Sequence, residues 1–322
     1  MKAAVYYETG GPEVFVYEEV PDPEVRGSGV IVQVGAVGIQ GGDLLHRQGG
    51  VMAGSPHVVG YQAAGTVVAV GDKVTNLVEG QRVVATMGHG SHAELLSVPA
   101  GACYAIPDSL SVDEAAGIPI EYGTAHDCLF EFGRLQPGET VLIQAGAGGV
   151  GLAAIQLAHA AGATVLATAS SDDRLARLGE YGLDHAINYV EQDVAREVMA
   201  LTENRGVDLV VDPVGGKTLE ASIASLAYRG RISWVGQAGR ADTPPEVWPI
   251  MQKNGSISGV FLGAEMGMNP QRTRPMIEAL VARIGTGELK VVVDSVFPLE
   301  EAGAAHTYIE SRQAFGRVLL RP

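Results

Sequence analysis

Short runs rich in Val and Ile recur through the first 120 residues, and Gly, Pro or Asp bounds each run. Such runs predict β-strands, because β-branched side chains favour an extended backbone and the bounding residues favour turns. The regular spacing of the turns predicts an all-β barrel or a strongly curved sheet. The predicted strands are Val14–Val20, Gly29–Val37, Gly65–Val70 and Arg82–Ala85.

From about Glu121 the pattern changes to apolar strands that alternate with helices. Near-continuous apolar strands in this alternation indicate a parallel sheet covered by helices on both faces, an α/β fold. The predicted strands are Thr140–Ala145, Thr164–Ala169, Val207–Asp212, Arg231–Gly236 and Ser256–Phe261. The predicted helices are Gly151–Ala161, Asp172–Tyr181, Asp193–Thr202 and Lys217–Leu226.

The C-terminal part predicts one more helix, Arg272–Gly285, and two strands, Val291–Phe297 and Arg317–Leu320. These strands resemble the first part of the chain, so we expect the tail to return to the first domain. A length of 322 residues is also typical of two domains.

Composition excludes several classes of protein. Hydrophobic residues at 46% and charged residues at 18% are typical of a soluble globular chain. Two cysteines cannot form a disulfide framework or a four-thiolate zinc site. The net charge of -15 argues against nucleic acid or an anionic membrane as a partner. The first residues lack the apolar core of a secretory signal, so we expect a cytoplasmic protein.

The stretch from Thr140 to Ser171 carries no formally charged side chain when His159 is neutral. A hydropathy window would mark it as membrane-spanning. However, glycines cluster inside it, and Lys or Arg does not flank it on both sides. A buried strand, a glycine turn and a buried helix fit this stretch better.

The glycine turn matches the dinucleotide-binding pattern G-x-G-x-x-G. A chain with 43 glycines can match it by chance, but here the pattern follows an apolar strand and opens a helix, as the fingerprint requires. The first glycine permits a tight turn, the second lets a pyrophosphate approach the backbone, and the third lets helix and strand pack closely. The residues are Gly146, Ala147, Gly148, Gly149, Val150 and Gly151.

The next strand decides which nucleotide we expect. An NAD site usually has Asp or Glu at the end of this strand, but here it ends in Ala169-Ser170-Ser171, followed by Arg174 in the helix. Two hydroxyls and a guanidinium suit a 2′-phosphate. The sequence therefore favours NADP(H), although Arg174 could instead be an ordinary solvated helix charge.

A metal site is not expected. His89 and His92 have an H-x-x-H spacing, but no cysteine, Asp or third His lies near them in the sequence. We interpret the histidines as surface or hydrogen-bonded groups, and Cys103 and Cys128 as small buried residues.

Motifs along almost the whole chain resemble the zinc-free, quinone-oxidoreductase-like branch of the medium-chain dehydrogenase/reductases, which includes zeta-crystallin. Besides the glycine loop, the segments that carry the resemblance are Gly38-Ile39-Gln40-Gly41-Gly42-Asp43, Gly60-Tyr61-Gln62-Ala63-Ala64-Gly65, Gly80-Gln81-Arg82-Val83, Ile118–Ala125, Asp208–Gly215 and Gly316-Arg317-Val318-Leu319-Leu320.

The resemblance implies a GroES-like β-barrel domain, residues 1–121 and 266–322, and a Rossmann doubly wound parallel-sheet domain, residues 122–265. It implies that the nicotinamide lies in a cleft between them and that the protein is a dimer or tetramer. Zinc-bearing relatives hold their metal at positions that here are Ile39/Gln40 and Tyr61-Gln62, so the resemblance implies chemistry without zinc.

The resemblance also implies roles for individual residues. Ser170, Arg174 and Tyr189 match positions that hold the 2′-phosphate of NADPH, with Ser171 beside them. Thr124 and the backbone of Ala147–Val150 match positions near the nicotinamide and pyrophosphate. The segments that border the nicotinamide contain Val235, Gly236, Phe261 and Leu262. Tyr189 and Phe261 could instead be core aromatics.

The acceptor pocket departs most from the family pattern. Gln40 replaces the usual Asn, Leu45 a frequent Tyr, and Ile120-Glu121-Tyr122 a small or apolar stretch, with His126-Asp127 close behind. We expect Gln40 and Tyr61 to face the acceptor, with Asp43 and His46 as polar neighbours. Asp43 is as readily interpreted as a helix cap.

Three functions remain open from the sequence, each with a small molecule as partner. The first is hydride transfer from NADPH to a quinone. The second is reduction of an α,β-unsaturated carbonyl, for which an acid such as Tyr61 must protonate the α-carbon. The third is NADPH binding without turnover, as in a crystallin-like or regulatory protein.

Overall fold

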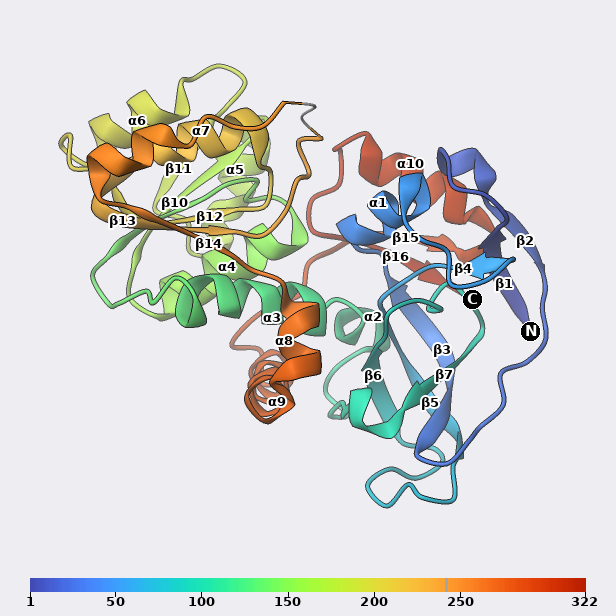
Figure 1. Cartoon of the computed structure of the whole chain (residues 1–322). Helices are drawn as coiled ribbons and strands as arrows, with labels where there is room; N and C mark the ends of the chain where they lie inside the picture. Colours follow the sequence, from blue (N-terminus) through green and yellow to red (C-terminus); the bar gives the residue numbers. More distant parts are fainter. Residues whose placement is uncertain (241–242) are drawn as a thin grey trace. The chain divides into compact units, whose positions relative to one another are not determined.

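Two compact units make up the computed structural model, which describes residues 1–240 and 243–322 (Figure 1). Unit 1 comprises Met1–Ile120 and Arg274–Pro322, and unit 2 comprises Glu121–Thr273. The sequence places the boundaries at 121 and 265. The second division instead falls inside a helix, α9 (Pro270–Gly285).

A parallel sheet forms the centre of unit 2, in the strand order β11-β10-β9-β12-β13-β14. This order, in which the chain runs outward from the middle in both directions, is that of doubly wound dinucleotide-binding folds. Helices α6 and α7 cover one face and α4 the other (Figure 1). The strands are β9 (Thr140–Ile143), β10 (Thr164–Ala169), β11 (His185–Asn188), β12 (Val207–Asp212), β13 (Leu226–Trp234) and β14 (Ser256–Gly259). The helices are α4 (Gly149–Ala160), α5 (Asp172–Leu178), α6 (Val194–Leu201) and α7 (Gly216–Ala224).

The uncharged stretch from Thr140 to Ser171 forms β9, the glycine turn, α4 and β10, so the expectation of a buried strand, turn and helix is confirmed. Residues from Gly151 to Ala158 of α4 are all buried, which explains why this helix lacks a polar face. Among the described residues, we find no helix with the length and apolar character needed to span a bilayer.

Unit 1 contains a sheet in the order β15-β16-β3-β5-β6-β8 and a smaller one in the order β2-β1-β4. Strand β3 pairs with β5 along one edge, while β7 pairs with its first half and β16 with its last residues. The C-terminal strand is therefore part of the first unit's sheet. The strands are β1 (Lys2–Tyr6), β2 (Val16–Glu19), β3 (Gly29–Gly38), β4 (His57–Val58), β5 (Gln62–Val70), β6 (Arg82–Thr86), β7 (Leu95–Pro99), β8 (Cys103–Ala105), β15 (Val293–Pro298) and β16 (Arg317–Arg321).

The remaining helices matter for the sites below. They are α1 (Gly41–Gly49), α2 (Val112–Ala115), α3 (Pro119–His126), α8 (Leu262–Met268) and α10 (Ala302–Glu310). Short 3₁₀ turns are η1 (Pro12–Val14), η2 (Ala100–Ala102), η4 (Gly179–Tyr181), η5 (Trp248–Lys253) and η6 (Leu299–Glu301), and η3 (Asp127–Glu131) is a π-helix.

Several predicted boundaries are wrong. The strand predicted at Val14–Val20 starts only at Val16, because Pro12 opens a 3₁₀ turn that includes Val14. The helix predicted at Lys217–Leu226 ends at Ala224, and β13 begins at Leu226 rather than at Arg231. The physical reason is tertiary: Leu226 pairs with Val207 of β12, and the Lys253 ammonium donates to the carbonyls of Ala224 and Leu226.

Candidate functional site

The glycine loop of unit 2 is a tight turn between β9 and α4. Ala145 has a left-handed backbone with φ of 53°, and Gly148 is the N-cap of α4. A Cβ atom on Gly151 would lie 2.4 Å from the Ala145 carbonyl oxygen, so only glycine fits there. A Cβ on Gly148 would meet only that same oxygen, at 3.4 Å, and would otherwise fill space over the helix N-terminus. The N-terminus of a helix, with its N–H groups and positive dipole end, suits the pyrophosphate of a dinucleotide.

A buried hydrogen-bond network holds this loop from below, and sequence reasoning missed it. Thr168 accepts from the Ala145 amide at 3.1 Å and donates to the Gln144 side chain at 2.9 Å. Gln144 donates to Ser222, which donates to Asp212 at 2.8 Å. The network therefore fixes the strained Ala145 through three strand ends and α7.

Asp212 ends this network and also holds the turn that follows β12. Besides Ser222, its carboxylate accepts from the amides of Val214 at 2.8 Å and Gly215 at 2.9 Å. The carboxylate is fully buried, yet it is well satisfied as an acceptor. The signal in the sequence was a lone polar residue at the end of each apolar strand.

The residues expected to hold a 2′-phosphate lie at neighbouring strand ends. Ser170 and Ser171 follow β10, and the Tyr189 amide donates to the Ala169 carbonyl at 3.2 Å. Ser171 is the N-cap of α5, but within the described ranges its side chain makes no capping hydrogen bond. Arg174 lies one turn into α5, and Tyr189 is 44% exposed. These residues, the expected 2′-phosphate corner, lie after the carboxyl ends of the neighbouring strands β10 and β11 and in the first turn of α5.

The residues expected beside the nicotinamide also follow carboxyl ends of strands. Val235 and Gly236 follow β13, and Phe261 and Leu262 follow β14, its neighbour. The Val235 amide donates to the Asp212 carbonyl, which joins this segment to the end of β12. Phe261 is 74% exposed and therefore is not a core aromatic, whereas Leu262 and Thr124 are buried. The loop, the 2′-phosphate corner and these segments share one edge of the sheet.

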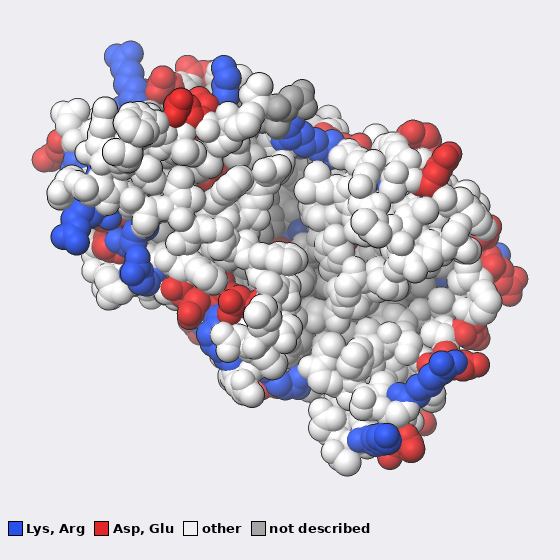
Figure 2. Space-filling model, in the orientation of Figure 1, with Lys and Arg blue, Asp and Glu red and all other residues white. Residues whose placement is uncertain are grey.

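The charge pattern of the surface agrees with a local anion site rather than a basic face. On the face shown in Figure 2, Lys and Arg side chains are interspersed with Asp and Glu rather than gathered in one patch. A chain with a net charge of -15 must therefore bind a phosphate-rich molecule through local donors. The loop amides, the serine hydroxyls and Arg174 fit a dinucleotide phosphate in that way.

In unit 1, Asp43 caps helix α1. The Gln40 amide donates to the Asp43 carboxylate at 2.7 Å, and Gln40 and Asp43 form a capping box. Asp43 is fully buried, and its carboxylate contacts the start of the helix. The Gln40 side chain is 5% exposed, and its amide lies 3.4 Å from the Gly38 carbonyl.

Tyr61 lies against the first turn of the same helix. Its hydroxyl donates to the Gly42 carbonyl at 3.1 Å, and a Cβ on Gly42 would lie 2.6 Å from the ring. Gly42 is therefore needed for the ring to reach the helix. Burial, together with the negative charge of Asp43, raises the pKa of Tyr61 to about 12, so the phenol keeps its proton at neutral pH. Its neighbour Gln62 is structural: its side chain bonds the backbone of Ala116 and Ile120.

A row of aromatic and histidine rings lies on the same unit, and His46 is the member of it that the sequence predicted as a site residue. His46 lies one helical turn beyond Gly42. Its Nδ1 shares a hydrogen bond of 3.0 Å with the Tyr6 hydroxyl, and its ring stacks on that of His57 with 4.9 Å between the ring centroids. His57 in turn lies 5.0 Å from Tyr6 and 5.6 Å from the exposed His89. We refer to Tyr6, His46, His57 and His89 as the ring row.

The ring row is held uncharged at its centre. Burial, and then the neighbouring His46 and His89, lower the pKa of His57 to about 4. The Ala53 amide donates to Nδ1 of His57 at 3.1 Å, so the ring proton is on Nε2. Burial and the charge of Asp43 raise the pKa of Tyr6 to about 12.

A second histidine pair, His92 and His306, is buried under α10. The fully buried Arg47 donates to Nδ1 of His306 at 3.2 Å, so His306 carries its proton on Nε2 and donates to Nε2 of His92 at 3.1 Å. Burial lowers the pKa of His92 to about 3, and that of His306 also falls well below its usual value. Both are hydrogen-bonded core groups, as the sequence analysis expects of its histidines, while His89 is exposed.

No group of three His, Cys, Asp or Glu side chains is placed to hold a metal ion within residues 1–240 and 243–322. Cys103 and Cys128 are both buried, which confirms their interpretation as small core residues. Burial raises the pKa of both thiols, to about 12 for Cys103.

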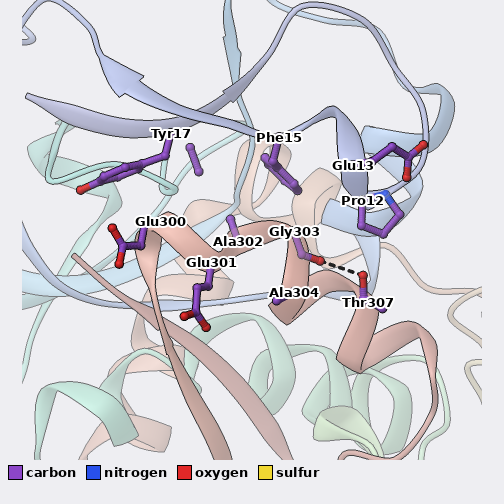
Figure 3. Close-up of a pocket in the computed structure, with 11 residues that line it drawn as sticks. Pro12, Glu13, Phe15, Tyr17, Glu300, Glu301, Ala302, Gly303, Ala304 and Thr307 are labelled. Atoms are coloured by element: carbon purple, nitrogen blue, oxygen red, sulfur yellow. Dashed lines mark hydrogen bonds between the residues drawn. The ribbon is translucent and has the colours of Figure 1, made fainter.

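A hollow of about 490 Å³ in unit 1 lies between η1, β2 and the start of α10 (Figure 3). The Phe15 ring points toward Gly303, whose carbonyl accepts from the Thr307 hydroxyl at 2.9 Å. None of the predicted site residues lines this hollow. Its lining is Ala4, Pro12, Glu13, Phe15, Tyr17, Glu300, Glu301, Ala302, Gly303, Ala304 and Thr307.

Comparison with protein families matches both units. The model of the alcohol dehydrogenase GroES-like domain matches residues 27–108, and the model of the zinc-binding dehydrogenase family matches residues 149–296. A 2-haloacrylate reductase from Burkholderia sp is 33% identical over 99% of this chain and 98% of its own length. A quinone oxidoreductase from Pseudomonas aeruginosa is 32% identical over 97% of both chains.

The chain belongs to the zinc-free, quinone-oxidoreductase-like branch of the medium-chain dehydrogenase/reductase family. Unit 1 is its GroES-like domain and unit 2 its Rossmann domain, and the protein is an oxidoreductase. The crystal structure of the Escherichia coli quinone oxidoreductase, which contains NADPH, covers 100% of both chains with a TM-score of 0.95 and 28% identity.

Proposed function

We propose that this oxidoreductase transfers a hydride from NADPH to a quinone. When bound, NADPH supplies the hydride that, with one proton from water, converts a quinone to the hydroquinone and leaves NADP⁺. Unit 2 provides the cofactor groups: the Gly146–Gly151 loop for the pyrophosphate, and Ser170, Ser171, Arg174 and Tyr189 for the 2′-phosphate. Support for the cofactor comes from the NADPH held by the related Escherichia coli enzyme.

The ring row and Tyr61 support a quinone as the acceptor. Planar rings stack favourably on aromatic side chains, and this surface of unit 1 offers several in succession. The nearby donors are the Tyr61 hydroxyl and the Gln40 side-chain amide, which here donate to the carbonyls of Gly42 and Gly38. By turning away from these carbonyls, they would donate to the developing negative charge on a quinone oxygen. No acid is needed for this reaction, because water protonates the hydroquinone oxygen.

Charge further favours an uncharged acceptor. His57 and Tyr6 are neutral at pH 7, and Asp43 places a negative charge beneath Tyr61. A carboxylate substrate would be repelled by that charge. The sequence relationship to a 2-haloacrylate reductase nevertheless supports a second candidate, reduction of an α,β-unsaturated carbonyl. In that reaction the protonated Tyr61 hydroxyl would deliver the proton to the α-carbon.

The two candidates are separated by acceptor preference. Purified protein is assayed for NADPH oxidation with 1,4-benzoquinone, 2-cyclohexenone and 2-chloroacrylate. We expect kcat/KM for the quinone to exceed that for either alkene. Turnover of the alkenes alone would overturn the quinone assignment in favour of the second candidate. Tight NADPH binding without oxidation across all acceptors would overturn both and favour a non-catalytic binding protein.

Tyr61→Phe tests the placement of the acceptor. We expect kcat/KM for the quinone to fall about tenfold, the value of one hydrogen bond to a charged oxygen. Tyr7→Phe is the matched control, since Tyr7 is an exposed tyrosine of the same unit that bonds Glu18. If Tyr61→Phe and Gln40→Ala both keep the wild-type kcat/KM, these residues do not contact the acceptor.

A further inference from the structure

Asp127 is a fully buried carboxylate that the reaction above does not use. It opens the π-helix Asp127–Glu131, and Arg272 of α9 binds it with two hydrogen bonds, Nη1 to Oδ1 at 2.7 Å and Nη2 to Oδ2 at 2.8 Å. Burial acts to raise the pKa of Asp127, but the hydrogen bonds from Arg272, together with the His126 ring 3.8 Å away, outweigh it, so the pKa lies below its usual value. A bidentate pair of this kind fixes both groups in orientation as well as in position.

The π-helix that holds Asp127 is itself anchored to the sheet. The Phe132 amide donates to the Asp127 carbonyl at 3.0 Å, and the Ser233 hydroxyl of β13 donates to the Cys128 carbonyl at 2.6 Å. The Arg231 side chain donates to the Gly133 carbonyl at 2.6 Å. Single π-helical turns occur mostly as inserted features, frequently at functional sites. Asp127 is thus a fixed point on unit 2.

Arg272 extends this fixed point to helix α8. The same Nη2 that binds Asp127 donates to Glu265 of α8 at 2.9 Å. Phe261 is the N-cap of α8, and its carbonyl accepts from the amides of Ala264 and Glu265. Two carboxylates from different helices therefore converge on one guanidinium, and the α8 N-terminus, with Phe261 and Leu262, is held by that contact.

Thr124, the other residue expected beside the nicotinamide, lies in the same helical segment as Asp127. It precedes Asp127 by three residues, so both lie on the same face of the α3 and π-helical segment. Of the segments expected to border the nicotinamide, Thr124 is joined to Asp127 through one helical turn, and Phe261–Leu262 is joined to Arg272 through Glu265. The residues expected to hold the 2′-phosphate follow β10 and β11 or lie at the start of α5, and the described structure shows no contact between them and this pair.

We propose that Asp127, Arg272 and Glu265 form a latch that positions the nicotinamide-facing segments for hydride transfer. The proposal rests on the proposed function, since it takes Thr124, Phe261 and Leu262 as neighbours of the nicotinamide. Asp127 and Arg272 are positioning residues. The latch acts on the geometry of the reactive end of the cofactor and leaves the affinity of the adenosine end unchanged.

Arg272→Met tests the latch through three measurements on the full chain. We expect kcat with 1,4-benzoquinone to fall about 10–100-fold, because small misplacements of reacting groups cost this much. The rise in nicotinamide fluorescence when NADPH binds should shrink toward that of the free cofactor. The Kd for 2′,5′-ADP, which occupies the adenosine end only, should change by less than about twofold, as expected for sites without shared partners.

Arg205→Met is the matched control. Arg205 binds Asp208 with the same bidentate geometry, both distances being 2.7 Å, but at the amino end of β12, opposite the cofactor edge. It should leave kcat and the fluorescence unchanged. Arg272→Lys, which keeps the charge without the planar fork, should restore part of the lost kcat.

Three outcomes would overturn the latch. They are a wild-type fluorescence rise in Arg272→Met, equal losses in Arg272→Met and Arg205→Met, or a 2′,5′-ADP affinity that falls as far as kcat. If Arg272→Met does not fold, Glu265→Gln removes one contact of the latch and must show the same pattern at smaller size. The fluorescence measurement needs no acceptor, so it tests the latch even if no quinone is reduced.

Discussion

The glycine loop of unit 2 and the ring row of unit 1 reach a defined geometry by opposite routes. The loop is one continuous segment, and its shape follows from glycines at fixed spacing and from a polar side chain at the end of each neighbouring strand. The ring row is collected from β1, α1, β4 and the loop before β7. Its side chains interact by stacking and burial, one hydrogen bond joins Tyr6 to His46, and another joins His57 to the Ala53 amide.

This difference shows which part of the candidate site a local motif can specify and which part depends on the tertiary structure. A dinucleotide phosphate needs backbone N–H groups at a helix start, and a local sequence motif can specify these. A planar acceptor needs only a surface of suitable shape and polarity, which segments of any origin can supply. We therefore expect the loop to respond to the addition of a single methyl group, and the ring row to respond to a change of pH.

The largest effect should come from the loop itself. Gly151→Ala places a Cβ 2.4 Å from the Ala145 carbonyl, so we expect a loss of about 1–3 kcal/mol in unfolding free energy and little NADPH binding. Gly148→Ala meets the protein only at ordinary contact distance, so it should fold normally yet raise the NADPH Kd about 10–100-fold. Thermal unfolding and NADPH titration measure the two quantities.

Gly179→Ala is the control for both variants, since a Cβ there meets no atom within 4 Å. If Gly148→Ala and Gly179→Ala bind NADPH equally well, the space over Gly148 does not receive the pyrophosphate.

The 2′-phosphate corner should show a smaller and more selective effect. Arg174→Ala should raise the NADPH Kd about 10–100-fold, the value of charge-assisted hydrogen bonds, and leave NADH binding nearly unchanged. Arg177→Ala is the control, because Arg177 is an exposed arginine of α5 three residues further along. Equal weakening of both cofactors in Arg174→Ala would contradict the assignment.

Unit 1 should respond to pH instead. The pKa of His57 is about 4 and that of His92 about 3 in the folded protein, both below the ordinary 6.5. Between pH 6.5 and these lower values, each histidine binds more protons in the unfolded chain than in the folded one. The contribution of these neutral histidines to the unfolding free energy is therefore fully present above pH 6.5, and it is lost as the pH falls toward 4 and then 3. For His92 alone, the loss from pH 6.5 to pH 5 is at most about 2 kcal/mol.

Hydrogen exchange at pH 7.5 and pH 5 measures this effect for each unit. Protection of β1, α1 and β4 should fall more than that of β9 and β10, after correction for the intrinsic exchange rate. His92→Gln cannot titrate and should flatten the dependence. Identical changes in both units would remove the distinction between them.

Prediction from the sequence succeeded where a pattern is local. The alternation of strands and helices after Glu121, the loop and its helix, and the buried cysteines are all as expected. It failed where a distant segment sets a boundary, as when pairing with Val207 draws Leu226 into β13. The residues proposed to face the acceptor were only partly predicted: His46 was named, but Tyr6 and His57 are far from it in the sequence and belong to ordinary strands.

The sequence by itself determined the family, the two kinds of domain and the cofactor loop, because these depend on hydrophobic periodicity and on glycines whose spacing is read along the chain. Only the tertiary structure decided that Asp43 is a helix cap, that His57 and His92 are uncharged, and that Asp127 meets Arg272. Each of these depends on which groups surround a side chain and how far water is excluded from it, and residues distant in sequence supply those surroundings.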